Sequence, residues 1–173
     1  FYGSFPLVKE YYDIDSTYEE LMLERTPFEE IVEWLDAELL DLASQLPVQL
    51  KNISEDHGRA TKGMALAVRA HVHMLAASPL FNGNPMYADI RNADGTPLFP
   101  QTYDKEKWKR AADAVKDIFD LGVYSLYKQY NEDGTLDPFL SYMNIHFATG
   151  ASNPELIFIN NNCNYSEADK NMN

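Results

Sequence analysis

Several pairs of adjacent carboxylates are the first residues of this sequence whose types could do chemistry. The pairs are Glu19-Glu20, Glu29-Glu30 and Glu55-Asp56. A glycosidase requires two carboxyl groups that face each other across a cleft, one of them with a raised pKa. Because most of these acids fall on the predicted solvent faces of helices, we expect none of the pairs to be catalytic. We therefore expect a protein that is not an enzyme.

Two histidines lie close together in the sequence, at His71 and His73. In a helix, residues two apart point roughly 200° away from each other around the axis. They cannot share a metal ion as residues four apart do, so we expect each to pack or to accept a hydrogen bond. We expect no metal site from this pair.

A calcium-like segment begins at Gln129, with Asn131, Asp133 and Asp137 at ligand spacing. Calcium loops of this kind start with Asp and end with a Glu that binds through both oxygens. Gln129 takes the first of these positions and Leu140 the last, so a tight turn is the better interpretation. We expect no metal and no cofactor.

Aromatic and amide side chains in loops are the residues that we expect to touch a ligand. Sugar binding uses ring faces for stacking, and amides for hydrogen bonds to hydroxyl groups. Five residues of this kind lie in predicted loops: Asn84, Tyr87, Asn161, Asn162 and Tyr165. The first two belong to the irregular stretch 79–103, whose length between two helices is unusual and often functional.

The charge balance of the chain limits its partners. There are 27 acidic and 14 basic side chains among 173 residues, which gives a formal net charge of −13. This balance excludes a nucleic-acid partner and an anionic membrane surface, and it suits a neutral ligand such as a sugar. The lone Cys163 allows no internal disulfide, and it lies near no obvious base.

Three segments have the apolar periodicity of amphipathic helices, at about 26–46, 60–78 and 104–121. Thr26 and Glu29 predict a capping box at the start of the first. The second has small and apolar residues nearly all round, which predicts a central helix packed on several sides. The second and third resemble an antiparallel pair of the tetratricopeptide kind.

The rest of the chain is expected to be irregular, with three short exceptions. A short helix is predicted over 139–146 and a strand-like run over 156–159. The segments 92–96 and 131–135 have the composition of tight turns.

The second helix and its flanks carry a pattern that resembles the SusD/RagB family. The pattern is GRATKGMALA at 58–67, followed by AASPLFNG at 76–83. Further segments fall in the family's order, at 5–8, 26–32, 41–47, 108–112, 122–126 and 153–158. The matches keep one order along nearly the whole chain, and this agreement carries the resemblance.

The resemblance implies a mostly α fold, in which tetratricopeptide-like helical hairpins carry long irregular loops. It also implies a surface-exposed lipoprotein of the Bacteroidetes outer membrane. Such a protein covers a SusC-like TonB-dependent transporter and binds oligosaccharides or, in RagB-like members, peptides. The alternatives are a scaffold that only docks the transporter and, less favoured, a glycan-acting enzyme.

Family members are longer than this chain, so we expect residues 1–173 to be one partial domain that lacks the natural N- and C-terminal parts. The sequence begins at Phe1 with no signal peptide, and no run of 18 apolar residues occurs in it. Contact with the membrane would then be made only by a lipid anchor outside this segment.

Overall fold

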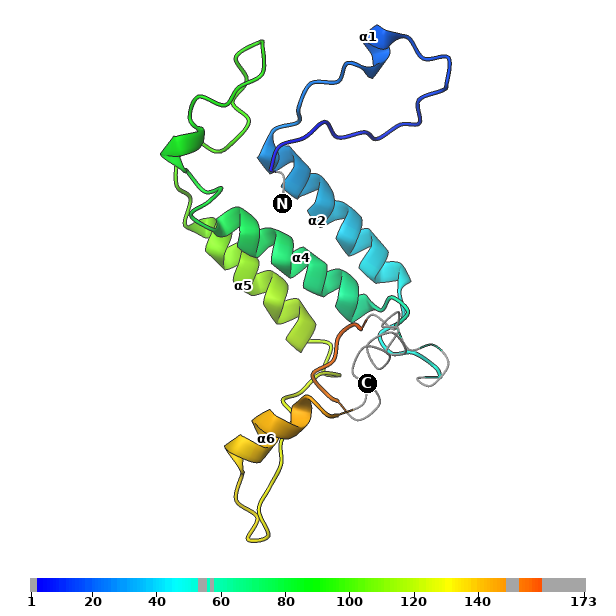
Figure 1. Ribbon diagram of the computed structural model, residues 1–173, viewed down its shortest axis with the longest axis vertical. Coiled ribbons are helices and arrows are strands. Elements are labelled where there is room, and N and C mark those ends of the chain that lie inside the picture. The colour runs from blue at the N-terminus through cyan, green and yellow to red at the C-terminus, as the bar shows by residue number, and fades with distance from the viewer. Residues whose placement is uncertain (1–2, 53–55, 57, 149–152, 160–173) are drawn as a thin grey trace, which may run out of the picture.

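Three antiparallel helices form the centre of the molecule (Figure 1). They are α2 (Phe28–Gln45), α4 (Lys62–Ala77) and α5 (Glu106–Phe119), seen in a computed structural model that describes residues 3–52, 56, 58–148 and 153–159. Helix α4 packs on both α2 and α5, whereas these two described helices make no close backbone contact with each other. The mostly α architecture with long loops is therefore confirmed.

Helix α2 begins where predicted, but its cap differs from the prediction. Its N-cap position is Pro27, and no side chain caps the helix there. The Thr26 hydroxyl instead accepts from the backbone N–H of Leu7 (3.2 Å), and Glu29 pairs with Lys107 of α5. The predicted capping box is therefore wrong, because Thr26 is used to hold the extended N-terminal segment.

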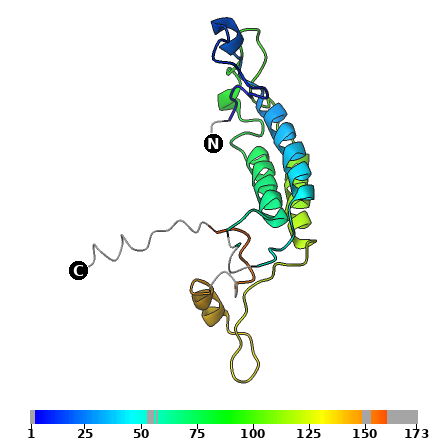
Figure 2. The same ribbon diagram turned by 90° about the vertical axis from the view of Figure 1, so that its right-hand side faces the viewer.

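Helix α4 is the middle helix, as its composition predicts. The Thr61 hydroxyl caps it by accepting from the N–H of Met64 (3.3 Å). Figure 2 shows α4 standing out to one side of α2 and α5. The packing is therefore on two sides only, and Val68 and Met74 on the outward face remain exposed. The expectation of close packing nearly all round holds for the inward face alone.

Helix α5 returns alongside α4 and places Ala111 and Ala114 in the buried contact. The Asp104 carboxylate accepts from the N–H of Glu106 (2.9 Å), as expected at a helix start. Gly122 has φ +67° and donates its N–H to the carbonyl of Phe119 (3.0 Å). The predicted left-handed residue after this helix is confirmed.

Two long excursions, residues 4–25 and 82–103, lie together at one end of the helices, which we call the loop end (Figures 1 and 2). They contain the short helices α1 (Tyr18–Leu21) and η1 (Pro85–Tyr87). The N–H of Phe28 donates to the carbonyl of Leu98 (2.9 Å), and the amide of Asn92 donates to the carbonyl of Arg25 (2.9 Å). These bonds join the two excursions near their bases.

The second excursion is closed at its neck by two residues. The Asn82 amide donates to the carbonyl of Asp104 (2.8 Å), and the N–H of Asp104 donates to Asn82 Oδ1 (2.9 Å). Asn82 is buried, so both bonds are shielded from solvent. The helices before and after the excursion are thus joined directly.

The opposite end holds the chain that follows α5. Helix α6 (Pro138–Ile145) confirms the predicted short helix, and Asp137 caps it by accepting from the N–H of Leu140 (2.8 Å). The strand-like interpretation of 156–159 is wrong: no strand occurs in the described ranges, which contain two isolated bridges, Arg91–Pro97 and Tyr130–Leu136. This run meets the side of α4 instead of another extended segment.

The two predicted turns are confirmed and are nearly identical. In each, the first Asn donates its N–H to the Thr carbonyl, at 3.0 Å for Asn92 and 2.8 Å for Asn131. In each, an Asp carboxylate accepts from the N–H of the Thr two residues later, at 2.8 Å for Asp94 and 2.9 Å for Asp133. The shared pattern Asn-x-Asp-Gly-Thr therefore builds the same turn twice.

Candidate functional site

Tyr87 lies in a cluster of four aromatic rings at the base of the loop end. Its ring centroid is 4.7 Å from that of Phe99 and 6.2 Å from that of Phe81, and Phe28 stacks on Phe81 at 4.4 Å. Phe28 and Phe81 are buried and Tyr87 is half-buried. Much of the Tyr87 ring therefore packs against the protein, and its contact with a ligand stays a prediction.

Asn84 lies three residues earlier and shapes the start of η1. Its Oδ1 accepts from the N–H of Met86 (3.0 Å), and its amide nitrogen donates to the carbonyl of Leu80 (3.1 Å). The structure thus brings Asn84 and Tyr87 together in one turn. The other candidates, Asn161, Asn162 and Tyr165, lie outside the described residues.

A polar pocket lies between the three central helices, on the inward face of α4. The Arg69 Nε donates to Asp36 Oδ1 (2.6 Å), and His73 Nε2 lies 2.5 Å from the same oxygen. Arg69 Nη1 also donates to Asp117 of α5 (2.7 Å). The pocket has a volume of about 290 Å³, and its lining residues are Val32, Glu33, Asp36, Arg69, His73, Arg110 and Asp113.

The electrostatics of this pocket favour structure over catalysis. Partial burial acts to raise the pKa of Asp36, but the hydrogen bonds from His73 and Arg69 and the charge of Arg69 outweigh it and lower the pKa below its ordinary value. A carboxyl with a lowered pKa stays ionised near neutral pH and is a poor general acid. The Asp36–Arg69–Asp117 chain therefore serves to tie three helices together.

An apolar cleft lies on the outward face of α4, where residues 155–158 meet the helix. It has a volume of about 560 Å³, and its lining residues are Met64, Ala67, Val68, His71, Val72, Glu155, Leu156, Ile157 and Phe158. His71 lines this cleft while His73 lines the polar pocket. The prediction that the two histidines face different sides is confirmed.

The cleft was missed at the sequence level because its two walls are far apart in the chain. The helical period shows that Met64, Val68 and His71 share a face, but not what covers it. The covering run contains Leu156 and Phe158, which the sequence assigned to a strand. The aliphatic and aromatic residues of that run were the available signal.

The paired carboxylates do not form facing pairs among the described residues. Glu20 accepts from the N–H of Thr17 (2.8 Å) in the capping box of α1. Glu29 pairs with Lys107, and Asp56 pairs with Arg59 at 3.2 Å. These acids therefore act separately as caps and ion-pair partners.

The calcium-like segment forms a turn and a helix cap. Asp133 accepts from the Thr135 hydroxyl (2.6 Å) and N–H, and Asp137 caps α6. The hydrogen bonds from Thr135 lower the pKa of Asp133. Across the described ranges, no group of three or more His, Cys, Asp or Glu side chains is arranged to hold a metal ion.

The described part of the chain was also searched for membrane-spanning helices. None of its helices combines the length and the apolar character needed to cross a bilayer.

Comparison with known structures places this arrangement. No protein-family model and no curated protein matches the chain. It is similar to the solved structure named BT4246, with a TM-score of 0.74 and 29% identity over 93% of this chain, and to its selenomethionine form, with a TM-score of 0.70. It is also similar to the crystal structure of a SusD-like protein (BF3747) from Bacteroides fragilis NCTC 9343, with a TM-score of 0.57 and 19% identity over 91% of this chain.

The chain spans 32% of the BT4246 chain and 22% of the BF3747 chain. The likeness includes nearly all of the residues described above, so it concerns the excursions as well as the three helices. The chain therefore has the fold of part of a SusD-like protein.

Proposed function

We propose that the protein belongs to the SusD/RagB family and is the binding component of an outer-membrane nutrient-uptake complex. In this role it captures an oligosaccharide and passes it to a SusC-like TonB-dependent transporter. The observation that carries the proposal is the likeness to a SusD-like protein over 91% of this chain. The GRATK and AASPLFNG patterns support it, since they flank and build α4, the middle helix of that fold.

A neutral ligand fits the electrostatics of the chain. The net charge of −13 would repel anionic polymers, whereas a neutral glycan is indifferent to it. Amide and aromatic side chains in the loop around η1 offer hydrogen bonds and a ring edge of the kind that sugars use. We place one part of the ligand contact there, at Asn84 and Tyr87.

Binding rather than catalysis is the proposed activity. The carboxylates with a lowered pKa, Asp36 and Asp133, are both satisfied by hydrogen bonds from their own chain. The adjacent acid pairs act as caps and ion-pair partners, so no pair among them supports a glycosidase mechanism. The proposed location is the cell surface, with a lipid anchor outside residues 1–173.

The test is calorimetric titration of the full-length protein with a panel of neutral oligosaccharides, and in parallel with a tryptic digest of casein. We expect heat of binding for at least one oligosaccharide and no change in its chain length after incubation. Binding of casein peptides alone would identify a RagB-like peptide binder. Hydrolysis of any oligosaccharide that one Asp or Glu substitution abolishes would contradict the proposal.

A further inference from the structure

The N-terminal excursion carries many apolar side chains into solvent. Over residues 9–25, which we call the acidic arm, the exposed large hydrophobic residues include Tyr11, Tyr12, Ile14, Tyr18, Leu21 and Met22. Tyr18 is 75% exposed and Met22 is 62% exposed. Single exposed apolar residues are common, but a contiguous set of them is typical of an interaction site.

The same arm is strongly negative. It contains six carboxylates and two cations: Glu10, Asp13, Asp15, Glu19, Glu20 and Glu24 against Lys9 and Arg25. Within the part of the chain that the structure describes, none of these carboxylates forms an ion pair. The charges are therefore available to attract a basic surface and to orient its approach.

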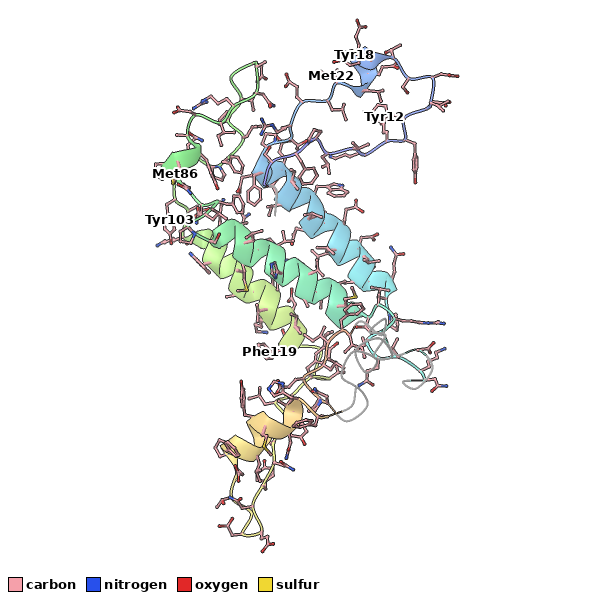
Figure 3. The ribbon with its side chains drawn as sticks, viewed as in Figure 1. Tyr12, Tyr18, Met22, Met86, Tyr103 and Phe119 are labelled. Carbon is pink, nitrogen blue, oxygen red and sulfur yellow. The ribbon has the colours of Figure 1, made fainter. Side chains whose placement is uncertain are left out.

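The arm is anchored to the helices at both ends. The N–H of Thr26 donates to the carbonyl of Phe5 (3.0 Å), which closes the excursion, and Asn92 binds the Arg25 carbonyl. Figure 3 shows Tyr12, Tyr18 and Met22 on this excursion, at the same end as Met86 and Tyr103 of the neighbouring one. A fixed base lowers the ordering entropy that binding would cost, so the arm is suited to present these side chains to a partner.

We propose that the acidic arm is a protein-docking surface and that its partner is the transporter, through an apolar surface that carries Lys and Arg. This proposal rests on the proposed function. The side-chain types favour a protein over a glycan, because Ile14, Leu21 and Met22 offer a sugar neither a flat ring nor a hydrogen bond. Tyrosine and methionine are enriched at protein interfaces, and methionine adapts to irregular apolar surfaces.

The experiment uses the full-length protein produced together with a tagged transporter, with recovery on the tag as the readout. The test variants are Tyr18→Ser/Met22→Ser and, for the charges, Asp15→Lys/Glu19→Lys. Glu20 is left intact because it belongs to the α1 capping box. The matched control is Phe119→Ser/Tyr142→Ser, because these residues are 72% and 73% exposed and lie outside the loop end.

We expect each arm variant to lower recovery about tenfold or more, as loss of interface anchors does, and the control to match the unchanged protein. Added salt should weaken the unchanged complex more than it weakens the Asp15→Lys/Glu19→Lys complex. Circular dichroism and calorimetric oligosaccharide binding of each variant report whether it is folded.

Two results would overturn the docking proposal while leaving the proposed function in place. One is equal recovery of the arm variants and the control. The other is a loss of oligosaccharide affinity with recovery unchanged, which would make the arm a ligand surface. If the unchanged protein is not recovered with the transporter at all, the proposed function itself fails, and the docking proposal fails with it.

Discussion

The side-chain amide of Asn92 donates to the backbone carbonyl of Arg25 at 2.9 Å, across 67 positions of sequence. Asn131 occupies the same position in the second Asn-x-Asp-Gly-Thr turn, but its amide donates to Thr135 of its own turn (3.1 Å). Two turns with one backbone geometry thus differ in a single role. One links the two excursions of the loop end, and the other bonds only within itself.

Asn92→Ala should loosen the acidic arm without unfolding the helices. Loss of one neutral hydrogen bond costs about 1 kcal/mol, so amide hydrogen exchange in residues 9–25 should become about fivefold faster. Exchange in α4 should not change. Asn131→Ala is the matched control, and faster exchange of the arm in that variant as well would argue against a specific link through Asn92.

Asp36→Asn should destabilise the central helices, because it removes the charge that pairs with Arg69 and His73. A hydrogen bond to a charged group contributes about 2 kcal/mol, so the urea midpoint of the full-length protein should fall. Asp120→Asn is the control, since its pair with Lys116 is exposed at the end of α5 and such pairs contribute little.

The same variant tests the pH dependence. The folded-state pKa of Asp36 is lower than its unfolded value, so its stabilisation is complete above the ordinary Asp pKa of about 3.9. It is lost as the pH falls through the folded pKa. Denaturation curves at several acidic pH values should therefore converge for Asp36→Asn and the unchanged protein. A gap that widens as the pH falls would contradict this assignment.

Gly63→Ala should destabilise the protein by steric overlap. A Cβ at this position would lie 2.0 Å from Tyr124 Oη and 2.7 Å from Cζ of the same ring. Overpacking of this kind costs about 1–3 kcal/mol. In a Tyr124→Ala background the sign should reverse, because alanine is a better helix former than glycine by about 1 kcal/mol. Destabilisation in both backgrounds would show that the Tyr124 contact is not the cause.

Tyr87 can be tested for its two roles separately. Tyr87→Ala should lower stability by about 3 kcal/mol, since truncation of a packed aromatic ring leaves a cavity, whereas Tyr87→Phe should leave the melting temperature unchanged. If the phenol hydroxyl holds a sugar, Tyr87→Phe should weaken oligosaccharide binding measured by calorimetry. Unchanged affinity in that variant would limit Tyr87 to packing.

The sequence predicted those elements whose signal is local. The three long helices fall within two residues of their expected bounds, because the apolar period of α2 and the prolines and glycines near the helix ends are local features. The twin turns and Gly122 were found for the same reason. In these cases neighbouring residues determine both the conformation and the pattern that reveals it.

The misses have the opposite origin. Thr26 and Glu29 have the spacing of a capping box, but their partners Leu7 and Lys107 come from distant segments. The contacts of Asp36 with Arg69 and His73 join helices, and no spacing along one helix reveals them. The run at 156–159 has apolar residues suited to a strand, yet it meets α4 and not another extended segment.

The paired hydrogen bonds between Asn82 and Asp104 have a consequence for variation of the chain. They set the distance between the end of α4 and the start of α5 independently of the residues between them. Because the entropy of loop closure rises slowly with length, the tip at 91–97 can be lengthened, shortened or exchanged at small cost. The excursion is thus a cassette: new recognition sequences can be grafted into it while the helices keep their register.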